Sequence, residues 1–439
     1  MCPSYRATRE EAHSTRGRAR LLFEMLHGDP LNGGWKDAHV KDALDLCLAC
    51  KGCKSDCPVN VDMATYKAEF LSHYYEGRLR PRPAYTMGFI HRWAPLASHA
   101  PRFVNLVAQT PGLSTFVRAV AGISQRRGLP RFADRTFVDW FRSRAPDPSG
   151  VRRRRVLLWP DTFNNHFHPD TAIAATEVLE AAGCDVILPA GALCCGRPLY
   201  DYGFLAEAKR LLRKGLDSLR PEIEAGTPIV VLEPSCYAVF RDELVNLFPD
   251  DSHAQKVSRQ TFLLADFLRT QVPGYTPPRL SQRVMLHGHC HHKAIATLGH
   301  EEALGRDMTT DLQVLDSGCC GMAGSFGFER NHYDVSMQVG ELVLLPAVRN
   351  ATAETLIVAD GFSCREQIAQ GTGHRAVHVA HALRLAMDSR RRNSDALVED
   401  GILPPRPDVL PACDVAAAAL IVIGVALSVS ALWPRGRRP

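Results

Sequence analysis

Short apolar runs recur in the second half of the chain, at 156–159, 229–232, 284–286 and 356–358. Each run has the length and composition of a strand, and longer stretches with helical periodicity lie between them, such as 205–219 and 333–348. Strands that alternate with helices predict parallel sheets in an α/β layer arrangement.

The runs belong to a unit that occurs twice. The first copy contains a Cys-Cys-Gly triplet at 194–196 and closes with Cys236, and the second contains the triplet at 319–321 and closes with Cys364. The two copies are offset by 128 residues at both ends and by 125 residues at the triplets. A fixed offset of this kind indicates two copies of one structural module.

The cysteines of both modules follow the predicted strands, so we expect them at the carboxyl ends of parallel strands, where sites form in α/β sheets. Vicinal cysteines rarely form a disulfide with each other because the ring is strained, and binding of a cluster or a metal is their natural use. The first module offers Cys194, Cys195 and Cys236. The second offers a richer set of soft ligands: Cys290, Cys319, Cys320 and Cys364, with His287, His289, His291 and His292 nearby. Cys184 and Cys413 have no counterpart in the repeat and are interpreted as small buried or incidental thiols.

A different cysteine pattern occupies the first part of the chain. Cys47, Cys50, Cys53 and Cys57 form the run C-x2-C-x2-C-x3-C, with Pro58 directly after it. This is the ligand run of a bacterial [4Fe–4S] ferredoxin, in which the fourth cysteine of a two-cluster protein reaches the other cluster. A structural zinc site would instead show two separated Cys or His pairs.

The pair Cys2-Pro3 matches the end of a companion run. If so, Cys2 completes the cluster held by Cys47, Cys50 and Cys53, Cys57 points to a second cluster, and the chain starts inside a two-cluster domain. The alternative is one cluster held by Cys47, Cys50, Cys53 and Cys57. The predicted metal ligands are therefore Cys2, Cys47, Cys50, Cys53 and Cys57.

The segment between these regions contains no cysteine, and its helical pattern is interrupted by several prolines. We expect its aromatic residues, which include Trp93, Phe103, Phe116, Phe132 and Trp140, to pack between helices. A docking face for a flavin partner or a membrane is the alternative interpretation.

Composition is that of a soluble multidomain enzyme. The 14 cysteines, with no secretory signal at the start, indicate a reducing compartment and metal-bound thiolates. The formal net charge of +5 is modest and comes without an aromatic-interleaved basic patch, which argues against a nucleic-acid partner.

The apolar segment 415–433 carries no charge, ends in Trp433 and precedes Arg435, Arg437 and Arg438. It is long enough to cross a bilayer, so it predicts a transmembrane or membrane-associated helix. With the reduced thiols, this predicts a location at the cytoplasmic face of the cell membrane.

The expected fold class is mixed α+β and α/β. The expected parts are a helical ferredoxin-type [4Fe–4S] domain at 1–77, a helical connector at 78–150, Cys-Cys-Gly modules at 151–275 and 276–390, a linker at 391–414 and the apolar helix at 415–433.

These motifs resemble a known family. The paired modules are similar to the cysteine-rich domain of heterodisulfide reductase, which also occurs in the iron–sulfur components of glycolate oxidase and anaerobic glycerol-3-phosphate dehydrogenase. The fullest resemblance is to the C-terminal half of bacterial FAD-linked oxidases of the D-lactate or 2-hydroxy-acid dehydrogenase type. It rests on segments 1–19, 47–58, 194–200, 287–293 and 360–368.

The resemblance implies an iron–sulfur component that passes electrons from a flavin to quinone or another carrier, with FAD on a partner or on a preceding domain, and with no general acid, base or nucleophile on this chain. Two departures from the family matter. The companion run and the flavin domain that the family would place before Cys2 are not in this sequence, so we expect no flavin chemistry from this chain alone, and Glu233 and Gly361 replace the first cysteine of the final C-x2-C of the fuller motif. A cluster in the second module is then expected only with a histidine as substitute ligand, and one in the first module is disfavoured. The alternatives are a heterodisulfide-reductase-like thiol–disulfide oxidoreductase and a zinc-stabilised scaffold.

Overall fold

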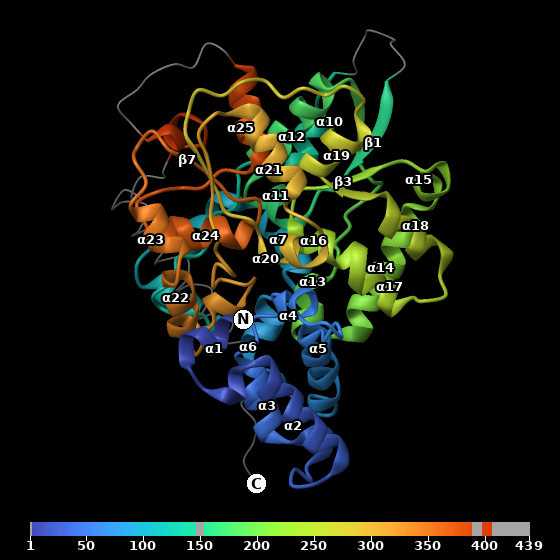
Figure 1. Ribbon diagram of the computed structural model, residues 1–439, viewed down its shortest axis with the longest axis vertical. Helices are drawn as coiled ribbons and strands as arrows, with labels where there is room; N and C mark the ends of the chain where they lie inside the picture. The colour runs from blue at the N-terminus through green and yellow to red at the C-terminus, as the bar shows by residue number, and fades with distance from the viewer. Residues whose placement is uncertain (1, 146–152, 389–396, 406–439) are drawn as a thin grey trace, which may run out of the picture.

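The computed structural model describes residues 2–145, 153–388 and 397–405. Helices from the first part of the chain form the lower end of the molecule in Figure 1, and two lobes, each built on a parallel sheet, lie side by side above them. The mixed α/β fold class predicted from the sequence is confirmed. The apolar segment 415–433 and Cys413 lie outside the described residues, and within those residues no helix is long and apolar enough to cross a membrane.

The N-terminal part is helical, and side chains cap its longer helices. Ser14 accepts a hydrogen bond from the N–H of Gly17 at the start of α2, and Asp37 and Asp62 cap α3 and α5 in the same way. The helices are α1 (Pro3–Thr8), α2 (Thr15–His27), α3 (Ala38–Asp45), α4 (Gly52–Asp56) and α5 (Met63–Tyr74), with 3-10 turns η1 (Glu11–His13) and η2 (Gly34–Lys36).

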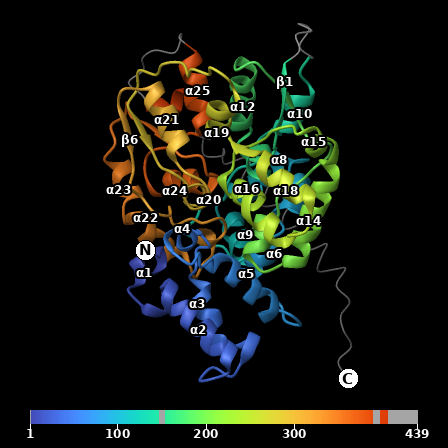
Figure 2. The same ribbon diagram turned by 45° about the vertical axis from the view of Figure 1, so that its right-hand side comes forward.

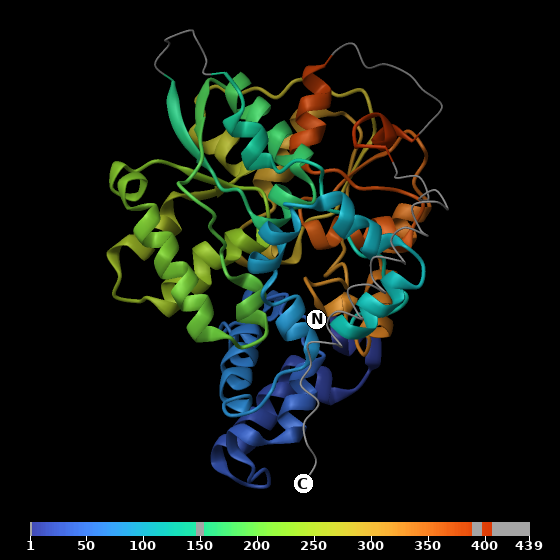
Figure 3. The same cartoon turned by 180° about the vertical axis from the view of Figure 1, so that it is seen from behind.

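The connector forms five short helices. Pro101 occupies the first turn of α8, where its missing N–H costs nothing, but Pro95 lies inside α7, so the prolines do not all delimit helices as the sequence indicated. The helices are α6 (Arg82–Thr86), α7 (Ile90–Ala97), α8 (Pro101–Gln109), α9 (Leu113–Ala121) and α10 (Phe137–Arg142). Seen from behind, in cyan, α8 and α9 lie along the second lobe (Figure 3), and the buried Arg127 that follows them donates hydrogen bonds to Gly327 O and Ser336 Oγ of that lobe.

The first lobe contains a four-stranded parallel sheet in the order β2-β1-β3-β4. Its strands are β1 (Arg154–Leu158), β2 (Cys184–Ile187), β3 (Ile229–Val231) and β4 (Thr261–Leu263). Its helices are α11 (Thr162–His166), α12 (Pro169–Ala181), α13 (Arg197–Asp201), α14 (Leu205–Ser218), α15 (Arg220–Ala225), α16 (Pro234–Ala238), the π-helical turn η3 (Val239–Glu243), α17 (Leu244–Leu247), α18 (Ser252–Gln260) and α19 (Leu264–Gln271).

The second lobe repeats this plan with a three-stranded parallel sheet in the order β6-β5-β7. Its strands are β5 (Val284–Leu286), β6 (Leu312–Val314) and β7 (Leu356–Val358). Its helices are α20 (Cys290–Ile295), α21 (Gly299–Met308), η4 (Phe326–Phe328), α22 (Tyr333–Glu341), α23 (Leu344–Arg349), α24 (Phe362–Gly371), α25 (Val379–Met387) and η5 (Val398–Gly401). The single helical stretch predicted at 333–348 is divided between α22 and α23.

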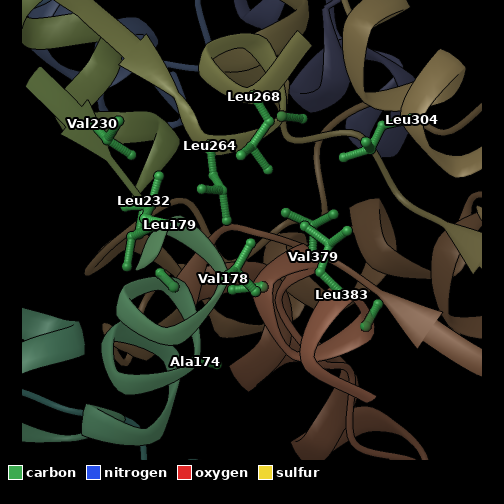
Figure 4. Close-up of a cluster of buried hydrophobic side chains, with 14 of the residues drawn as sticks. Ala174, Val178, Leu179, Val230, Leu232, Leu264, Leu268, Leu304, Val379 and Leu383 are labelled. Carbon is green, nitrogen blue, oxygen red and sulfur yellow. The ribbon is translucent and has the colours of Figure 1, made fainter. Parts of the chain in front are cut away.

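The two lobes share one hydrophobic core. Side chains of α12 and α19 from the first lobe meet those of α25 and α21 from the second (Figure 4), and Val178, Leu268, Leu304 and Leu383 are all buried there. Because each lobe covers one side of this core, the two modules form one structural unit, and their carboxyl-terminal sheet edges are held in a constant relation to each other.

Candidate functional site

The predicted position of the module cysteines is confirmed: each follows the carboxyl end of a strand. Cys194 and Cys236 follow β2 and β3 in the first lobe, while Cys290, Cys319 and Cys364 follow β5, β6 and β7 in the second. Equivalent strands therefore carry equivalent residues to the same edge of each sheet. In Figure 2, α16 and α20, which begin near these edges, lie close to α4 at the centre of the molecule.

The Cys-Cys-Gly triplets have the same backbone geometry in both lobes. Gly196 and Gly321 adopt φ values of +78° and +91°, which favour glycine, and their N–H groups donate to Cys194 Sγ and Cys319 Sγ, each at 3.4 Å. A Cβ on Gly321 would lie 2.1 Å from a backbone carbonyl oxygen. The small residue after each cysteine pair thus lets a backbone amide approach a sulfur.

The thiols of the second lobe interact with one another. Hydrogen bonds from Cys319 and Cys364 lower the pKa of Cys320 well below its usual range in spite of burial, and Cys319 in turn donates toward Cys290, which raises the pKa of Cys319. The charge of Cys290 also acts on Cys50 of the N-terminal part, whose pKa is raised first by burial and then by that charge. Cys50 and Cys290 also pack in one cluster with Cys319, so the thiols of the second lobe adjoin the ferredoxin-type run.

The ferredoxin-type cysteines lie around α4, and Cys2 joins them from the start of α1. Burial, followed by the charges of neighbouring groups that include Cys47 and Cys2, raises the pKa of Cys53 to about 11, and Cys2 and Cys47 act on Cys50 as well. Cys53 Sγ accepts a hydrogen bond from the N–H of Met63 at 3.4 Å. The structure therefore brings together the group of Cys2, Cys47, Cys50 and Cys53. Cys57 follows the last residue of α4, and its N–H donates to the carbonyl of Cys53.

A buried arginine holds Cys2 in this group. Arg18 donates to Cys2 Sγ at 3.2 Å, to Ser4 Oγ at 2.9 Å and to Ala43 O at 2.8 Å. Burial raises the pKa of the Cys2 thiol, but the charge of Arg18 and hydrogen bonds from its surroundings outweigh burial and lower it. A positive charge and an N–H donor set beside four thiols fit a cluster that carries thiolate ligands.

A network of buried charges attaches the α4 loop to the first lobe. Lys51 Nζ lies 2.7 Å from Asp62 Oδ2, 2.7 Å from Asp242 Oδ2 and 3.1 Å from Glu243 Oε1. Burial lowers the pKa of Lys51, but the three carboxylates outweigh it and hold the pKa well above its usual range. Arg197 pairs with the same Glu243 and donates to Ala49 O at 3.1 Å. No sequence pattern pointed to Lys51 in this role, although Arg197 belongs to a segment that carried the resemblance.

The first lobe has a different ligand set from the second. Cys195 Sγ and Cys236 Sγ are 3.0 Å apart, but Thr162 stands at the place of Cys290, and its hydroxyl donates to Cys194 Sγ at 3.7 Å. Glu233 Oε2 accepts a hydrogen bond from the N–H of Phe362 in the second lobe at 2.8 Å. Burial and then the nearby Asp161 raise the pKa of Glu233 to about 7.

In the second lobe a histidine takes the space of the cysteine that Gly361 replaces. A Cβ built on Gly361 would lie 2.2 Å from His289 Cδ2, so the imidazole fills the volume that a side chain at 361 would occupy. His289 Nδ1 accepts from the N–H of His291 at 3.1 Å, and burial lowers the pKa of His289 to about 3, so the ring is neutral. A neutral imidazole has the form that binds a metal.

The other histidines of this segment have structural partners. His287 Nδ1 lies 2.6 Å from Ser317 Oγ, His291 Nε2 lies 2.9 Å from Ala49 O, and His292 pairs with Glu301 at 3.0 Å. These three histidines therefore hold local structure together through their ring nitrogens.

A cavity of about 320 Å³ lies between the cysteine groups of the two lobes. Cys194, Cys195 and Cys236 line it from the first lobe, Cys290, Cys319 and Cys320 from the second, and Leu48 from the ferredoxin-type loop. Its opposite wall is formed by side chains of α6 to α9 and the segment after them.

Comparison with known proteins gives two family matches. Residues 1–61 match the 4Fe-4S dicluster domain, and residues 161–241 match the cysteine-rich domain. The chain is 30% identical over 216 residues to lactate utilization protein A of Bacillus velezensis, which covers 47% of this chain and 87% of that protein. The chain belongs to the iron–sulfur protein family of the FAD-linked oxidases.

Two further relatives extend the match. D-2-hydroxyglutarate dehydrogenase of Pseudomonas putida is 28% identical over 419 residues, which is 86% of this chain and 41% of that protein. A component of the anaerobic glycerol-3-phosphate dehydrogenase of Escherichia coli is 29% identical over 293 residues, or 65% and 72%. The chain thus spans about two fifths of the length of the first of these relatives. The predicted assignment as an iron–sulfur component of an oxidoreductase is confirmed.

Proposed function

We propose that this chain is the electron-transfer component of a FAD-linked 2-hydroxy-acid dehydrogenase of the lactate or glycolate type. A flavin on a partner or a further domain would oxidise the substrate, and the electrons would leave to quinone or another carrier. The observation that carries this proposal is the packing of Cys50 from the ferredoxin-type run in one cluster with Cys290 and Cys319 of the second lobe, both of which line the cavity. A [4Fe–4S] cluster, when bound, takes up and releases one electron at a time.

The residues of the chain would serve this cluster in distinct ways. Cys2, Cys47, Cys50 and Cys53 would be its ligands, and Arg18 would hold Cys2 in place and offset thiolate charge. Lys51 would keep the loop attached to the first lobe. Because this arrangement groups Cys2 with the first three cysteines of the run, it favours the interpretation in which Cys57 serves elsewhere.

We propose a second cluster in the second lobe. Cys290, Cys319, Cys320 and Cys364 interact there, and His289 occupies the place of the cysteine missing at 361. In the first lobe, Thr162 and Glu233 stand at two of the equivalent places, and Glu233 is engaged with the second lobe. Cys194, Cys195 and Cys236 are thus less suited to a cluster, and the proposal places none there.

The zinc-scaffold alternative has no geometric support among the described residues, where no three or more His, Cys, Asp and Glu side chains are grouped to hold a single metal ion. The proposed location at the cytoplasmic face of a membrane rests on the sequence alone, on the apolar segment 415–433 and on the cysteine content that indicates a reducing compartment.

The test measures iron, acid-labile sulfide and the electron paramagnetic resonance spectrum of anaerobically purified, dithionite-reduced protein. We expect about eight irons per chain, about four for each cluster, and two distinct signals. Cys2→Ser should abolish or alter one signal and leave the other, while Cys57→Ser, the matched control in the same domain, should leave both. The reverse result would assign the fourth ligand to Cys57, and zinc without iron would refute the electron-transfer role.

A further inference from the structure

The cavity beside the cysteines is apolar on the side away from them. Apolar side chains from α6 to α9 and the segments that follow these helices form this wall, among them Met87, Ile90, Val104, Ala108, Val117 and Leu129. Among the described residues that line the cavity, none of those from these connector helices is charged. A volume of about 320 Å³ is within the range of small-molecule sites and is large enough for a substituted ring system.

The outer faces of the same helices are also apolar. Trp93 and Leu96 on α7 are 51% and 64% exposed, and Phe116 and Val120 on α9 are 64% and 52% exposed. The expectation that the aromatic residues of this segment pack between helices is thus wrong for Trp93 and Phe116, and also for the exposed Phe103. It holds for Phe132, which packs against Phe167, and for Trp140, which packs against Phe137 at the shared core. A thin layer of short helices, with apolar side chains on both faces and with Arg92 and Arg102 also exposed on the outer one, therefore separates the cysteine wall from the outside. Its apolar side chains suit the passage of a lipid-soluble molecule.

The chemistry of the opposite wall limits the ligand further. Cys319 and Cys320, proposed ligands of the second-lobe cluster, reach the cavity together with the buried carboxyl groups of Glu233 and Asp161. An anionic ligand would lose its hydration against the apolar wall and meet these two carboxyl groups, while Arg197, the guanidinium that lines the cavity, is already paired with Asp201 and Glu243. Charged disulfides of the thiol–disulfide alternative are therefore disfavoured. An uncharged ring with polar substituents meets neither cost.

We propose that this cavity binds the ring of a quinone-class electron acceptor, with its apolar body against α7 to α9 and its polar substituents toward the cysteine wall. The inference rests on the proposed function and specifies its acceptor. Reduction of a quinone to the hydroquinone takes two electrons and two protons. The electrons would come from the reduced iron–sulfur centres of this chain, which are thereby reoxidised, and the protons would come from water.

The test uses cluster-loaded full-length protein and menadione, a soluble naphthoquinone. Binding to the oxidised protein is measured by equilibrium dialysis, and reoxidation of the dithionite-reduced protein by menadione is followed by absorbance. Val117→Trp places a large side chain in the cavity, and Val120→Trp makes the same change on the exposed face of the same helix. Ile90→Phe is a milder filling variant on α7 in case Val117→Trp does not fold.

We expect saturable binding to the wild-type protein, at least a tenfold loss of affinity in Val117→Trp and Ile90→Phe, and wild-type affinity in Val120→Trp. The absence of menadione binding, or equal losses in the lining and outer-face variants, would overturn the inference. Iron content and the resonance signals are recorded on the same samples. Intact clusters without quinone binding would refute this inference alone, whereas protein without iron would refute the proposed function.

Discussion

Replacement of Lys51 by methionine tests how much this lysine contributes to the attachment of the ferredoxin-type loop to the first lobe. The lysine side chain is fully buried, and its ammonium group lies against Asp62, Asp242 and Glu243 from two different parts of the chain. Methionine keeps most of the aliphatic volume but removes the charge. Three carboxylates are then left close together in a buried site with less compensation.

The size of the effect follows from these distances. At an effective dielectric constant of about 20, a pair separated by 2.7 Å interacts with a gross energy of about 6 kcal/mol, most of which offsets desolvation. Removal of one partner from a buried ion pair costs about 3–5 kcal/mol in measured cases. Lys54 meets Asp242 and Asp62 too, but its side chain is 26% exposed, so we expect about 1 kcal/mol for Lys54→Met.

Amide hydrogen exchange measures this local opening directly, and it does not require a two-state transition of a multidomain protein. In Lys51→Met, amides of residues 47–57 should exchange about 10²- to 10³-fold faster, because each 1.4 kcal/mol is a factor of ten. Lys54→Met is the matched control from the same loop, with an expected increase of about tenfold or less. Equal exchange in the two variants would refute the reasoning that burial of Lys51 decides the attachment.

Two further predictions concern the second lobe. Burial lowers the pKa of His332, but Asp45 and Glu329 outweigh it and raise the pKa above the usual 6.5, so the contribution of the charged histidine is fully present below pH 6.5 and is lost as pH rises through the raised value. His332→Gln should therefore flatten the decline of thermal stability above neutral pH, and an unchanged slope would contradict this. Gly321→Ala should lower stability by more than about 2 kcal/mol, because it combines a positive φ with a backbone clash, whereas Gly324→Ala, with positive φ and open space, should cost about 1 kcal/mol. Denaturant unfolding compares the two, and equal costs would count against the clash.

The central strands could be predicted from the sequence because their burial is complete. Strands β3, β5 and β7 are buried at every position, so they appear as uninterrupted apolar runs. The edge strands carry a weaker signal. In β2 an exposed Asp185 interrupts the run, and in β6 all three residues are partly or fully exposed. Their apolar pattern is too short and too mixed to distinguish from a loop.

The candidate site likewise has features that the sequence could predict and features that it could not. Cysteine spacing identified the thiols, since a ligand run has a fixed local geometry, and Cys184 proved to be buried on β2 as expected. The pairing of Lys51 with Asp242 joins residues 191 positions apart, and no local pattern records such a contact. The cavity was also hidden, because helices that are apolar on both faces have the composition of ordinary packed helices.

The repeat itself explains why the two lobes would have different roles. Glu233 in the first lobe is equivalent to Gly361 in the second, and Asp161 is equivalent to His289. Glu233 binds a backbone N–H of the second lobe, so its carboxyl group serves the contact between lobes, while the absence of a side chain at Gly361 makes room for the imidazole of His289. Glutamate at position 233 thus forms part of the cavity wall. Glycine at position 361 instead leaves a ligand set of cysteines and His289 beside the cavity. The asymmetry therefore supports a single acceptor site served by one module, with the second-lobe cysteines on the side that delivers electrons.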